Sequence, residues 1–425
     1  MYIEKVEICN FKAIEYMTIE FQQGTNLLIG VNGAGKTSIL EALTVALNGI
    51  LTGVSGVPVR NIRQEDIRFS LNFLGGASTG IQYHNPTEVT CHLKYGDERY
   101  RWTRRRQDET PRLNTKMDDK KISRYFTKIT NDPNSVLPLL SFESEARVWQ
   151  NRRGDFGKEL KKKLNDRRCG YIGCLDYSLD IKGIQAWCLK MELEAFQREE
   201  KIEEYEAFKK IVAVFMQQIS NLDTLPVLRY SRQLGDMVYR ERDCEMPVSS
   251  LSAGYQSLLW MVMNLAHRLA LLNPNHADTL QKTEGIVLID EIDMHLHPKW
   301  QWNVVSALES TFPNIQFIMA THSPIVISSC KNSTLIQVDE NQSIRYLENA
   351  YGYSVKDVLE LRQGSGEKPR KIEHLIDQFE KAVNREDYTA AKKVIEMMRS
   401  EPGEDHAEVQ NAEGELEMIN WIAEN

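Results

Sequence analysis

The first 50 residues change from an alternating to a helical hydrophobic pattern. Apolar side chains alternate over residues 17–21, and a short apolar run follows at 26–29, which predicts two β-strands. Over residues 36–48 the apolar positions instead recur every three or four residues, which predicts an α-helix that ends at Gly49. A strand, a glycine-rich turn and a helix therefore follow one another.

The rest of the chain alternates between helix and strand signals, which predicts an α/β fold. Residues 50–85 are rich in glycine, serine and asparagine and are predicted to form a loop. Residues 140–225 have a charged helical pattern without the heptads of a coiled coil. Further expected elements are a hairpin at 88–104, a helix at 253–272, strands at 286–289 and 316–320, a helix after Pro298, and acidic helices after Gly366.

Residues 30–37 read Gly-Val-Asn-Gly-Ala-Gly-Lys-Thr and fit the pattern G-x-x-x-x-G-K-[ST] at every position. In this pattern the glycines let successive backbone N–H groups face one anion, the lysine adds a charge for the β- and γ-phosphates, and the hydroxyl can bind Mg²⁺. A flexible glycine-rich turn would not explain Lys36 and Thr37 at the first helical turn. The residues predicted to bind ATP here are Gly30, Asn32, Gly33, Ala34, Gly35, Lys36, Thr37 and Ser38, with Lys36 also catalytic and Thr37 also a metal ligand.

A second candidate element is the apolar run at 285–289, which ends in Asp290 and Glu291. At the carboxyl end of a strand, Asp290 can hold Mg²⁺ through water opposite Thr37, and Glu291 can polarise the attacking water. Two acids after an apolar strand are common by chance. Together with the phosphate-binding loop, they form the second half of an NTP-hydrolysing site.

Two further motifs lie at predicted helix and strand ends. The segment Leu-Ser-Ala-Gly-Tyr-Gln at 251–256 puts Ser252 and Gly254 at a helix N-terminus, where they form either an anion site or a plain N-cap. His322 follows a strand and can reach the γ-phosphate from the side, although a lone histidine is more often structural. Gln64 is a further candidate for sensing Mg²⁺ and the attacking water.

In their order along the chain these motifs resemble the ABC-type ATPases of the RecF/SMC group. The phosphate-binding loop, the signature at 251–256, the Asp-Glu strand and the histidine switch at 322 cover both lobes of such a head, about residues 1–360. Asn10-Phe11-Lys12 is also similar to a segment of that family that lies near the nucleotide. The resemblance therefore implies that Lys12 contacts ATP.

Three positions depart from the family pattern. Ala253 replaces a glycine, Tyr255 precedes the glutamine, and His297 stands where transporter-type heads have an aspartate. The segment from Asp290 to Pro298 is instead similar to RecF-like ATPases of bacterial defence systems. His295 and His297 could alternatively bind a metal ion, but their spacing without a third ligand favours loop packing and dimer contact.

One chain carries one phosphate-binding loop and one signature, so the resemblance implies a homodimer, or a higher homo-oligomer, that holds two ATP molecules with Mg²⁺ between paired subunits. Hydrolysis would then open the interface. In each site one subunit would supply Lys36, Thr37, Asp290, Glu291 and His322, and the other would supply Ser252 and Gly254.

The spacing of the motifs narrows the choice among ABC-type ATPases further. About 210 residues separate Thr37 from Leu251, which leaves no room for the arms of Rad50-like or SMC proteins. The sequence shows no membrane span, which a transporter would need. It also shows no Toprim pattern, which a fused nuclease of that type would need. The layout is similar to PtuA of the Septu anti-phage system and of some retrons, which works with a separate HNH-type nuclease, and to AriA of the PARIS system. The resemblance implies a defence ATPase that controls a nuclease; the alternative is a RecF-like DNA-repair ATPase with nucleotide-gated DNA binding.

Two basic stretches could contact DNA. Residues 99–106 hold five arginines with Tyr100 and Trp102 between them, and residues 152–168 hold eight basic against three acidic residues. Such stretches can follow phosphates and stack on bases. Alternatively, the aromatic residues of the hairpin face the core while its arginines are solvated.

The net charge of −8 is unevenly distributed. Residues 1–370 carry 46 basic and 46 acidic residues, whereas residues 371–425 carry six basic and 14 acidic residues. Helical stripes in this acidic segment predict a helical hairpin and a further helix. These helices have two possible roles. They cap the core of the head, or they form a docking surface for a partner nuclease or for another copy of the ATPase.

Composition excludes a disordered or disulfide-stapled chain, because 42% of residues are hydrophobic and the seven cysteines are scattered. The N-terminus is too polar for a signal peptide, so we expect a cytoplasmic protein. The expected division is a first lobe with the phosphate-binding loop and hairpin at 1–140, a helical insertion at 141–230, a second lobe with the signature, Asp-Glu strand and histidine switch at 231–362, and an acidic helical region at 363–425.

Overall fold

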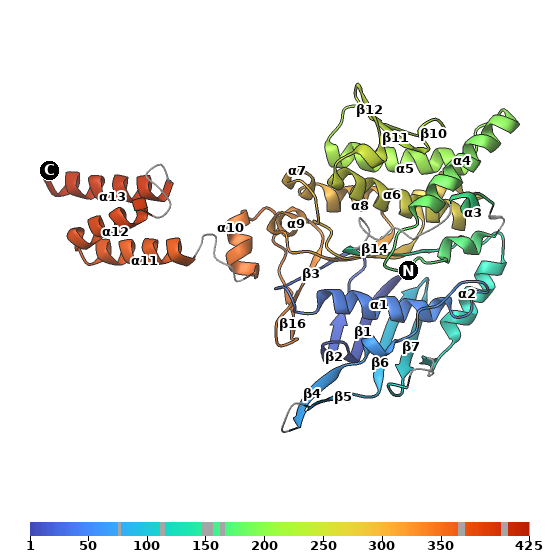
Figure 1. Cartoon of the computed structure of the whole chain (residues 1–425), viewed down its shortest axis with the longest axis horizontal. Helices are drawn as coiled ribbons and strands as arrows, with labels where there is room; N and C mark the ends of the chain where they lie inside the picture. The colour runs from blue at the N-terminus through green and yellow to red at the C-terminus, as the bar shows by residue number, and fades with distance from the viewer. Residues whose placement is uncertain are drawn as a thin grey trace. The chain divides into compact units, whose positions relative to one another are not determined.

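The computed structural model describes residues 1–74, 78–110, 115–145, 156–161, 166–363, 370–400 and 407–424. The chain forms two compact units, Met1–Tyr353 and Ser354–Asn425 (Figure 1). The first unit combines sheets and helices, and the described part of the second is helical. The predicted α/β class with a helical C-terminal region is therefore confirmed.

A six-stranded sheet forms the centre of the first unit. In spatial order its strands are β16 (Ile344–Leu347), β15 (Thr334–Val338), β3 (Thr25–Ile29), β14 (Ile315–Ala320), β13 (Gly285–Ile289) and β9 (Leu139–Glu143). The strands from β15 to β9 are parallel, and β16 runs antiparallel at one edge. Strands β3, β14, β13 and β9 are buried throughout, as expected for a parallel sheet covered on both faces.

An antiparallel sheet lies on the other side of helix α1 (Lys36–Leu51) from the central sheet (Figure 1). Its strands, in order, are β2 (Ile14–Glu20), β1 (Tyr2–Phe11), β6 (Thr87–Tyr95), β7 (Glu98–Arg106) and β8 (Lys116–Met117). Helix α1 contacts β1, β6 and β7 on one side and β14 on the other, and nearly all of its residues are buried. This helix is the core that the two sheets share.

Helices cover the opposite face of the central sheet (Figure 1). Helix α6 (Ala253–Leu272) packs on β9 and on α5 (Glu203–Ser220), which also contacts α8 (Val304–Thr311). Further elements described in this unit include α2 (Lys121–Asn131), α3 (Phe156–Lys161), α4 (Ile181–Arg198), α7 (Pro298–Gln301), α9 (Pro324–Ser329), the strands β10 (Val227–Ser231), β11 (Asp236–Glu241) and β12 (Cys244–Pro247), and the 3₁₀ turns Gln64–Asp66, Arg167–Tyr171, Val248–Ser250 and Ala277–Lys282.

The second unit begins with α10 (Val355–Val358) and a π-helical turn, Leu359–Gln363. Helices α11 (Arg370–Asn384), α12 (Tyr388–Ser400) and α13 (Ala407–Glu424) follow, with α12 packed against both α11 and α13. The predicted helical hairpin and further helix are thus confirmed. These helices bury a cluster of their own, which includes Leu375, Phe379, Ala391, Val394, Ile395, Met398, Val409 and Leu416.

Two predictions for the middle of the chain are wrong in part. Residues 50–85 are not all loop, because β4 (Phe69–Leu74) and β5 (Ser78–Tyr83) pair as an antiparallel ribbon. Phe69 is 54% exposed and Ile81 is 58% exposed, so these two apolar side chains do not mark the buried face that makes strands easy to recognise. The segment predicted as helical from residue 140 begins inside strand β9, whose short apolar run does not distinguish strand from helix.

The arginine-rich strand β7 also differs from both of its sequence interpretations. Trp102, Arg104 and Arg106 alternate toward the core, and the two arginines are only 1% and 4% exposed. Arg106 donates hydrogen bonds to the carbonyls of Ile62, Asp108 and Thr110. The exposed arginines of the strand are paired with carboxylates, as Arg99 with Glu4, Arg101 with Asp118 and Arg105 with Glu88. Most of the second basic stretch, 152–168, lies outside the described residues.

Gly49 does not end helix α1, as the sequence predicted, because the helix continues to Leu51. A Cβ at Gly49 would lie 2.5 Å from Nε1 of Trp102, whose indole N–H donates to the carbonyl of Ala46 at 3.0 Å. The glycine therefore allows β7 to approach the helix closely. Residue 49 is therefore a glycine because α1 and β7 pack closely there, and not because the helix ends there.

We expect Gly49→Ala to lower the free energy of unfolding by about 1–3 kcal/mol, because the added methyl group overpacks the contact with Trp102. Urea unfolding followed by circular dichroism measures this loss. In a Trp102→Phe background, which lacks Nε1, the same substitution should cost less. An equal cost in both backgrounds would contradict the contact.

Candidate active site

The candidate motifs meet at one edge of the central sheet because the strands that precede them are parallel neighbours. Leu28 of β3 pairs with Ala320 of β14, and Met319 pairs with Ile289 of β13. The turns that follow these strands are linked by backbone hydrogen bonds, among them Ile292 N–H to the carbonyl of Ala320 at 3.1 Å. Residues 30–37, 290–293 and 321–323 therefore lie at a common edge.

The phosphate-binding loop has the open backbone that an anion requires. Gly33 and Gly35 adopt φ values of +83° and +102°, and nothing lies within 4 Å of where their Cβ atoms would be. Gly35 precedes α1 without a side-chain cap, so the first N–H groups of the helix face the loop. A Cβ at Gly30 would lie 2.3 Å from the carbonyl oxygen of Val338, so this position also requires glycine. Of the other residues predicted to bind ATP, Asn32 and Thr37 are exposed, Ser38 is half-buried and Ala34 is buried.

Lys36 is folded back onto this loop. Its Nζ donates hydrogen bonds to the carbonyls of Gly30 at 2.9 Å and Val31 at 3.0 Å, and the residue is only 6% exposed. Burial lowers the pKa of Lys36 to about 8, although the nearby carboxylates Asp290, Glu291 and Asp293 oppose the shift. An anion in the loop would stabilise the charged form of this lysine.

Acidic residues and His322 surround the lysine. Asp290 is 1% exposed, and its backbone N–H donates to the carbonyl of Glu143 at 2.8 Å. Burial lowers the pKa of His322, Lys36 lowers it further, and Asp293 raises it. His322 is therefore neutral near pH 7 and can accept or donate a hydrogen bond.

Sequence reasoning missed two acidic residues at this edge. Asp293 accepts a hydrogen bond from the Thr321 hydroxyl, which links the turn after β13 to the turn after β14. Glu143 ends β9 opposite Ile289 and accepts a hydrogen bond from Asn264 at 2.7 Å. The available signal for Glu143 was an apolar run that ends in an acid, the same pattern that identified Asp290.

The signature residues lie beside a different part of the fold. Ser252 is exposed and occupies the N-cap position of α6, but its side chain makes no capping hydrogen bond, so a plain N-cap does not explain it. A Cβ at Gly254 would lie 2.6 Å from the carbonyl oxygen of His295 and 3.4 Å from the ring of Trp300. Gly254 thus packs on the loop after β13.

Lys12 contacts α1, whereas Gln64 contacts β5. The Lys12 ammonium pairs with Glu41, a buried residue of α1, and burial lowers the pKa of this lysine. Gln64 begins a 3₁₀ turn and donates its amide to the hydroxyl of Tyr83 at 3.1 Å. In the described structure these contacts direct Gln64 toward β5.

His297 caps helix α7, since its Nδ1 accepts a hydrogen bond from the backbone N–H of Lys299 at 3.2 Å. Among the described residues, no group of three or more histidine, cysteine or acidic side chains is arranged to hold a metal ion. His297 therefore makes a contact of the kind expected for loop packing.

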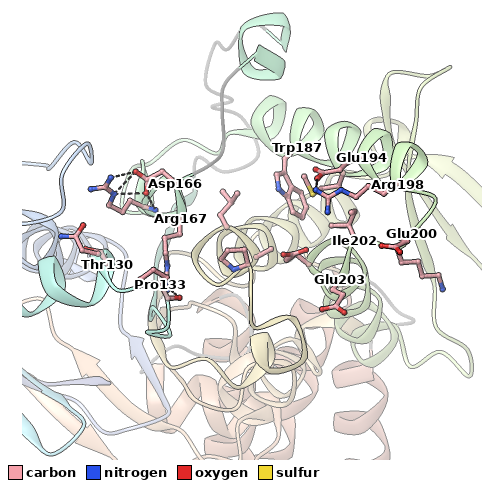
Figure 2. A pocket seen from close by; sticks show the side chains of 18 residues that line it. Thr130, Pro133, Asp166, Arg167, Trp187, Glu194, Arg198, Glu200, Ile202 and Glu203 are labelled. Carbon is pink, nitrogen blue, oxygen red and sulfur yellow. Dashed lines mark hydrogen bonds and ion pairs between the residues drawn. The ribbon is translucent and has the colours of Figure 1, made fainter.

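A separate cavity of about 870 Å³ lies near α4, α5 and α6 (Figure 2). Its lining includes Glu194, Glu200 and Glu203. The arginines there are already engaged, because Arg198 pairs with Glu194 and Arg167 donates to the carbonyl of Leu272 at 2.9 Å. The acidic lining and engaged arginines do not favour phosphate binding in this cavity.

The sequence matches the AAA-domain family over residues 5–228, which is more than half of the chain. The chain belongs to this family. A second AAA-domain family, whose description names the AbiEii toxin of a type IV toxin–antitoxin system, matches residues 189–328. The two ranges together include the phosphate-binding loop, the signature, the Asp-Glu strand and His322.

Two relatives match most of this AAA-domain chain. It is 25% identical to the Retron Vc95 probable ATPase of Vibrio cholerae serotype O1 biovar El Tor, over 86% of this chain and 80% of that protein. It is 24% identical to Septu protein PtuA of Bacillus thuringiensis, over 91% of this chain and 90% of that protein. The predicted resemblance to PtuA and its retron-associated relatives is confirmed by these matches.

Among solved structures, an SMC head bound to the C-winged helix domain of ScpA is 17% identical to this chain. It aligns with a TM-score of 0.48 over 82% of this chain and 98% of that chain. No helix in the described ranges is both long and apolar enough to cross a membrane.

The pKa of Lys36 predicts a pH-dependent stability. The folded chain loses the Lys36 proton near pH 8, whereas an unfolded lysine keeps it to about pH 10.5. Because the unfolded state binds more protons between these values, the contribution of Lys36 to the free energy of unfolding rises with pH in this window. We expect Lys36→Met to be more stable than wild type near neutral pH, with a difference that shrinks as the pH is raised through this window.

Urea unfolding at several pH values across this window measures the effect. Lys282→Met, which removes an exposed lysine away from the loop, should follow the wild-type pH profile. A constant difference between Lys36→Met and wild type at all pH values would contradict the depressed pKa.

Proposed function

We propose that this protein is an ATP-hydrolysing subunit of an anti-phage defence system. The proposal is supported by one observation above the others: Lys36, Asp290, Glu291 and His322 converge at one edge of a parallel sheet in an AAA-domain chain. The role in defence is supported by relatives that are named for a retron and for the Septu system.

In this proposal the loop binds the triphosphate through backbone N–H groups and the Lys36 ammonium. Lys36 leaves the carbonyls of Gly30 and Val31 when phosphate oxygens replace them. Glu291 accepts the proton of the attacking water, and neutral His322 donates a hydrogen bond toward the γ-phosphate. Lys12 and Gln64 stay weaker candidates, since each would have to leave its present partner.

The residues present also fit Mg²⁺. Asp290 provides a buried carboxylate and Thr37 an exposed hydroxyl, and oxygen atoms are the ligands that this ion prefers. When bound, Mg²⁺ would neutralise negative charge on the phosphates. Thr37 and Asp290 are the residues that we propose hold it.

We propose that two chains form each ATP site. Within one chain Gly254 packs on His295, and Ser252 is exposed with a hydroxyl that is not used for capping. These features leave Ser252 and the backbone at the N-terminus of α6 available to phosphates held by a second copy.

A nuclease of the HNH type is the partner that we propose for this ATPase. The acidic second unit, with its separate hydrophobic cluster, is the candidate docking surface. This assignment follows the expected division into a head with two lobes, a helical insertion and an acidic helical region. Direct DNA contact by β7 receives little support, because its exposed arginines are paired with carboxylates.

We expect Glu291→Gln to bind ATP but to hydrolyse it at least about 100-fold more slowly, because the water loses its general base. With ATP and Mg²⁺ the variant should form a dimer that light scattering detects as a doubled mass. Adding Ser252→Arg should abolish the dimer without changing the fold, since Ser252 is exposed. A Glu291→Gln chain that stays monomeric with saturating ATP would refute the shared site.

Truncation after Tyr353 tests the role of the second unit. The first unit ends there, where the Tyr353 carbonyl accepts a hydrogen bond from Ser328. We expect the shortened chain to keep ATPase activity and to lose co-purification with the nuclease. Loss of solubility or of ATPase activity would instead show that the second unit caps the head.

A further inference from the structure

A second pocket with basic lining lies at the opposite end of helix α1 from the phosphate-binding loop. It has a volume of about 640 Å³, a size typical of small-ligand sites. Since α1 spans 16 residues, the two ends lie roughly 24 Å apart along the helix. The pocket is lined by Thr52, Gly53, Val59, Asn61, Arg104, Thr115, Lys116, Met117, Lys120, Ser123, Arg124 and Thr127, and is called the basic pocket below.

Arg104 forms part of the lining of the basic pocket and is 1% exposed. Its Nη2 donates to the carbonyl of Arg60 and to the side-chain oxygen of Asn61, both at 3.0 Å. Its Nε and Nη1 have no hydrogen-bond partner among the described residues. Burial also lowers the pKa of this guanidinium to about 10. A buried cation with two unused donors is costly unless an anion satisfies it.

Helix α2 and its N-cap residue add two more cations to the basic pocket. Lys120, Ser123, Arg124 and Thr127 recur at helical spacing and therefore share one face of α2. Ser123 and Thr127 bind the end of α1, through Thr52 and Gly53, which turns this face toward the pocket. Lys120 lies at the N-cap, where the helix dipole also favours negative charge.

The described lining of the basic pocket contains basic, hydroxyl, amide and apolar residues but no carboxylate. The nearest acidic residues along the chain are Asp118 and Asp119, which already accept hydrogen bonds from the backbone of Thr103 and Lys121. The cavity of Figure 2 differs, because carboxylates line it and one of them, Glu194, pairs with Arg198. The described lining of the basic pocket therefore has a net positive charge that the lining of the Figure 2 cavity lacks.

We propose that the basic pocket binds the phosphate group of a small phosphorylated ligand, at a site separate from the ATP site. Arg104 supplies a buried guanidinium to the lining, and Lys120 and Arg124 supply exposed positive charges. A small ligand is favoured over a nucleic-acid backbone, because the buried guanidinium lines a cavity of about 640 Å³, a volume that fits a small ligand and not a duplex. The hydroxyl groups of Thr52, Thr115 and Ser123 add polar contacts for the rest of the ligand.

Isothermal titration of the full chain with tripolyphosphate tests this site. A Lys36→Ala background weakens binding at the phosphate-binding loop, so that the remaining heat reports on the basic pocket. In this background we expect Lys120→Ala and Arg124→Ala each to weaken binding about tenfold, the loss expected for one charged hydrogen bond. Lys128→Ala is the matched control, because Lys128 is an exposed residue of the same helix outside the lining.

Hydrogen exchange gives an independent readout that does not depend on a buried substitution. Tripolyphosphate should slow exchange over residues 120–127 in the Lys36→Ala chain. Arg104→Met should abolish both the heat of tripolyphosphate binding and this protection. If this substitution unfolds the chain, Lys120→Ala and Arg124→Ala still test whether the basic pocket binds phosphate. Titration with inorganic phosphate, ATP and CTP identifies the ligand: equal affinity for tripolyphosphate and nucleotides indicates recognition of phosphate alone, and tighter nucleotide binding indicates a nucleotide ligand.

Three results would overturn the proposal. The first is an absence of tripolyphosphate binding in the Lys36→Ala background. The second is equal weakening by Lys128→Ala, or no weakening by Lys120→Ala and Arg124→Ala. The third is displacement of tripolyphosphate by a short DNA duplex without terminal phosphates, together with weaker binding of that duplex to the Arg124→Ala variant. The occupant of the pocket would then be nucleic acid.

Discussion

Burial of helix α1 between two sheets is the constraint on which the rest of the structure depends. The helix begins at the phosphate-binding loop, so any shift along its axis would move Lys36 relative to Asp290 and His322. Its far end is fixed by the close approach of Trp102 to Gly49. Close packing transmits such shifts, because a core without voids has little freedom to adjust.

Electrostatics at the loop follow from this packing. Lys36 is held in a poorly solvated position against backbone carbonyls, and the neighbouring carboxylates only partly offset the cost of burying its charge. The site is thus arranged for a ligand that brings negative charge next to the lysine. The same reasoning applies to Arg104 at the other end of α1, where a guanidinium is buried with unused donors.

Short contacts lead from Arg104 to the 3₁₀ turn Gln64–Asp66. Arg104 donates to the carbonyl of Arg60, and the Arg60 guanidinium donates to the buried carboxylate of Asp66 at 3.0 Å. Asp66 closes the 3₁₀ turn that begins at Gln64. A ligand in the basic pocket would therefore contact residues that lead directly to this turn.

The sequence predicted those features that depend on local pattern. The loop at 30–37, the hairpin near Gly96 and the helix at 253–272 each carry their own spacing, and the structure contains all three elements. The position of Glu143 beside Asp290 could not be predicted, because it depends on which strand pairs with β13. Burial of Arg104 likewise depends on the packing of the C-terminal end of α1 against β7. No local sequence pattern predicts that contact.

The central claim is that two chains complete each ATP site, and complementation between inactive variants tests it most directly. Lys36→Ala removes the loop lysine, and Ser252→Arg blocks the exposed signature serine. In a mixed dimer, one site combines an intact loop from one chain with an intact signature from the other. If two chains complete each site, mixing the two variants restores ATP hydrolysis that neither shows alone. A mixture that stays inactive, although both variants are folded, would contradict this claim.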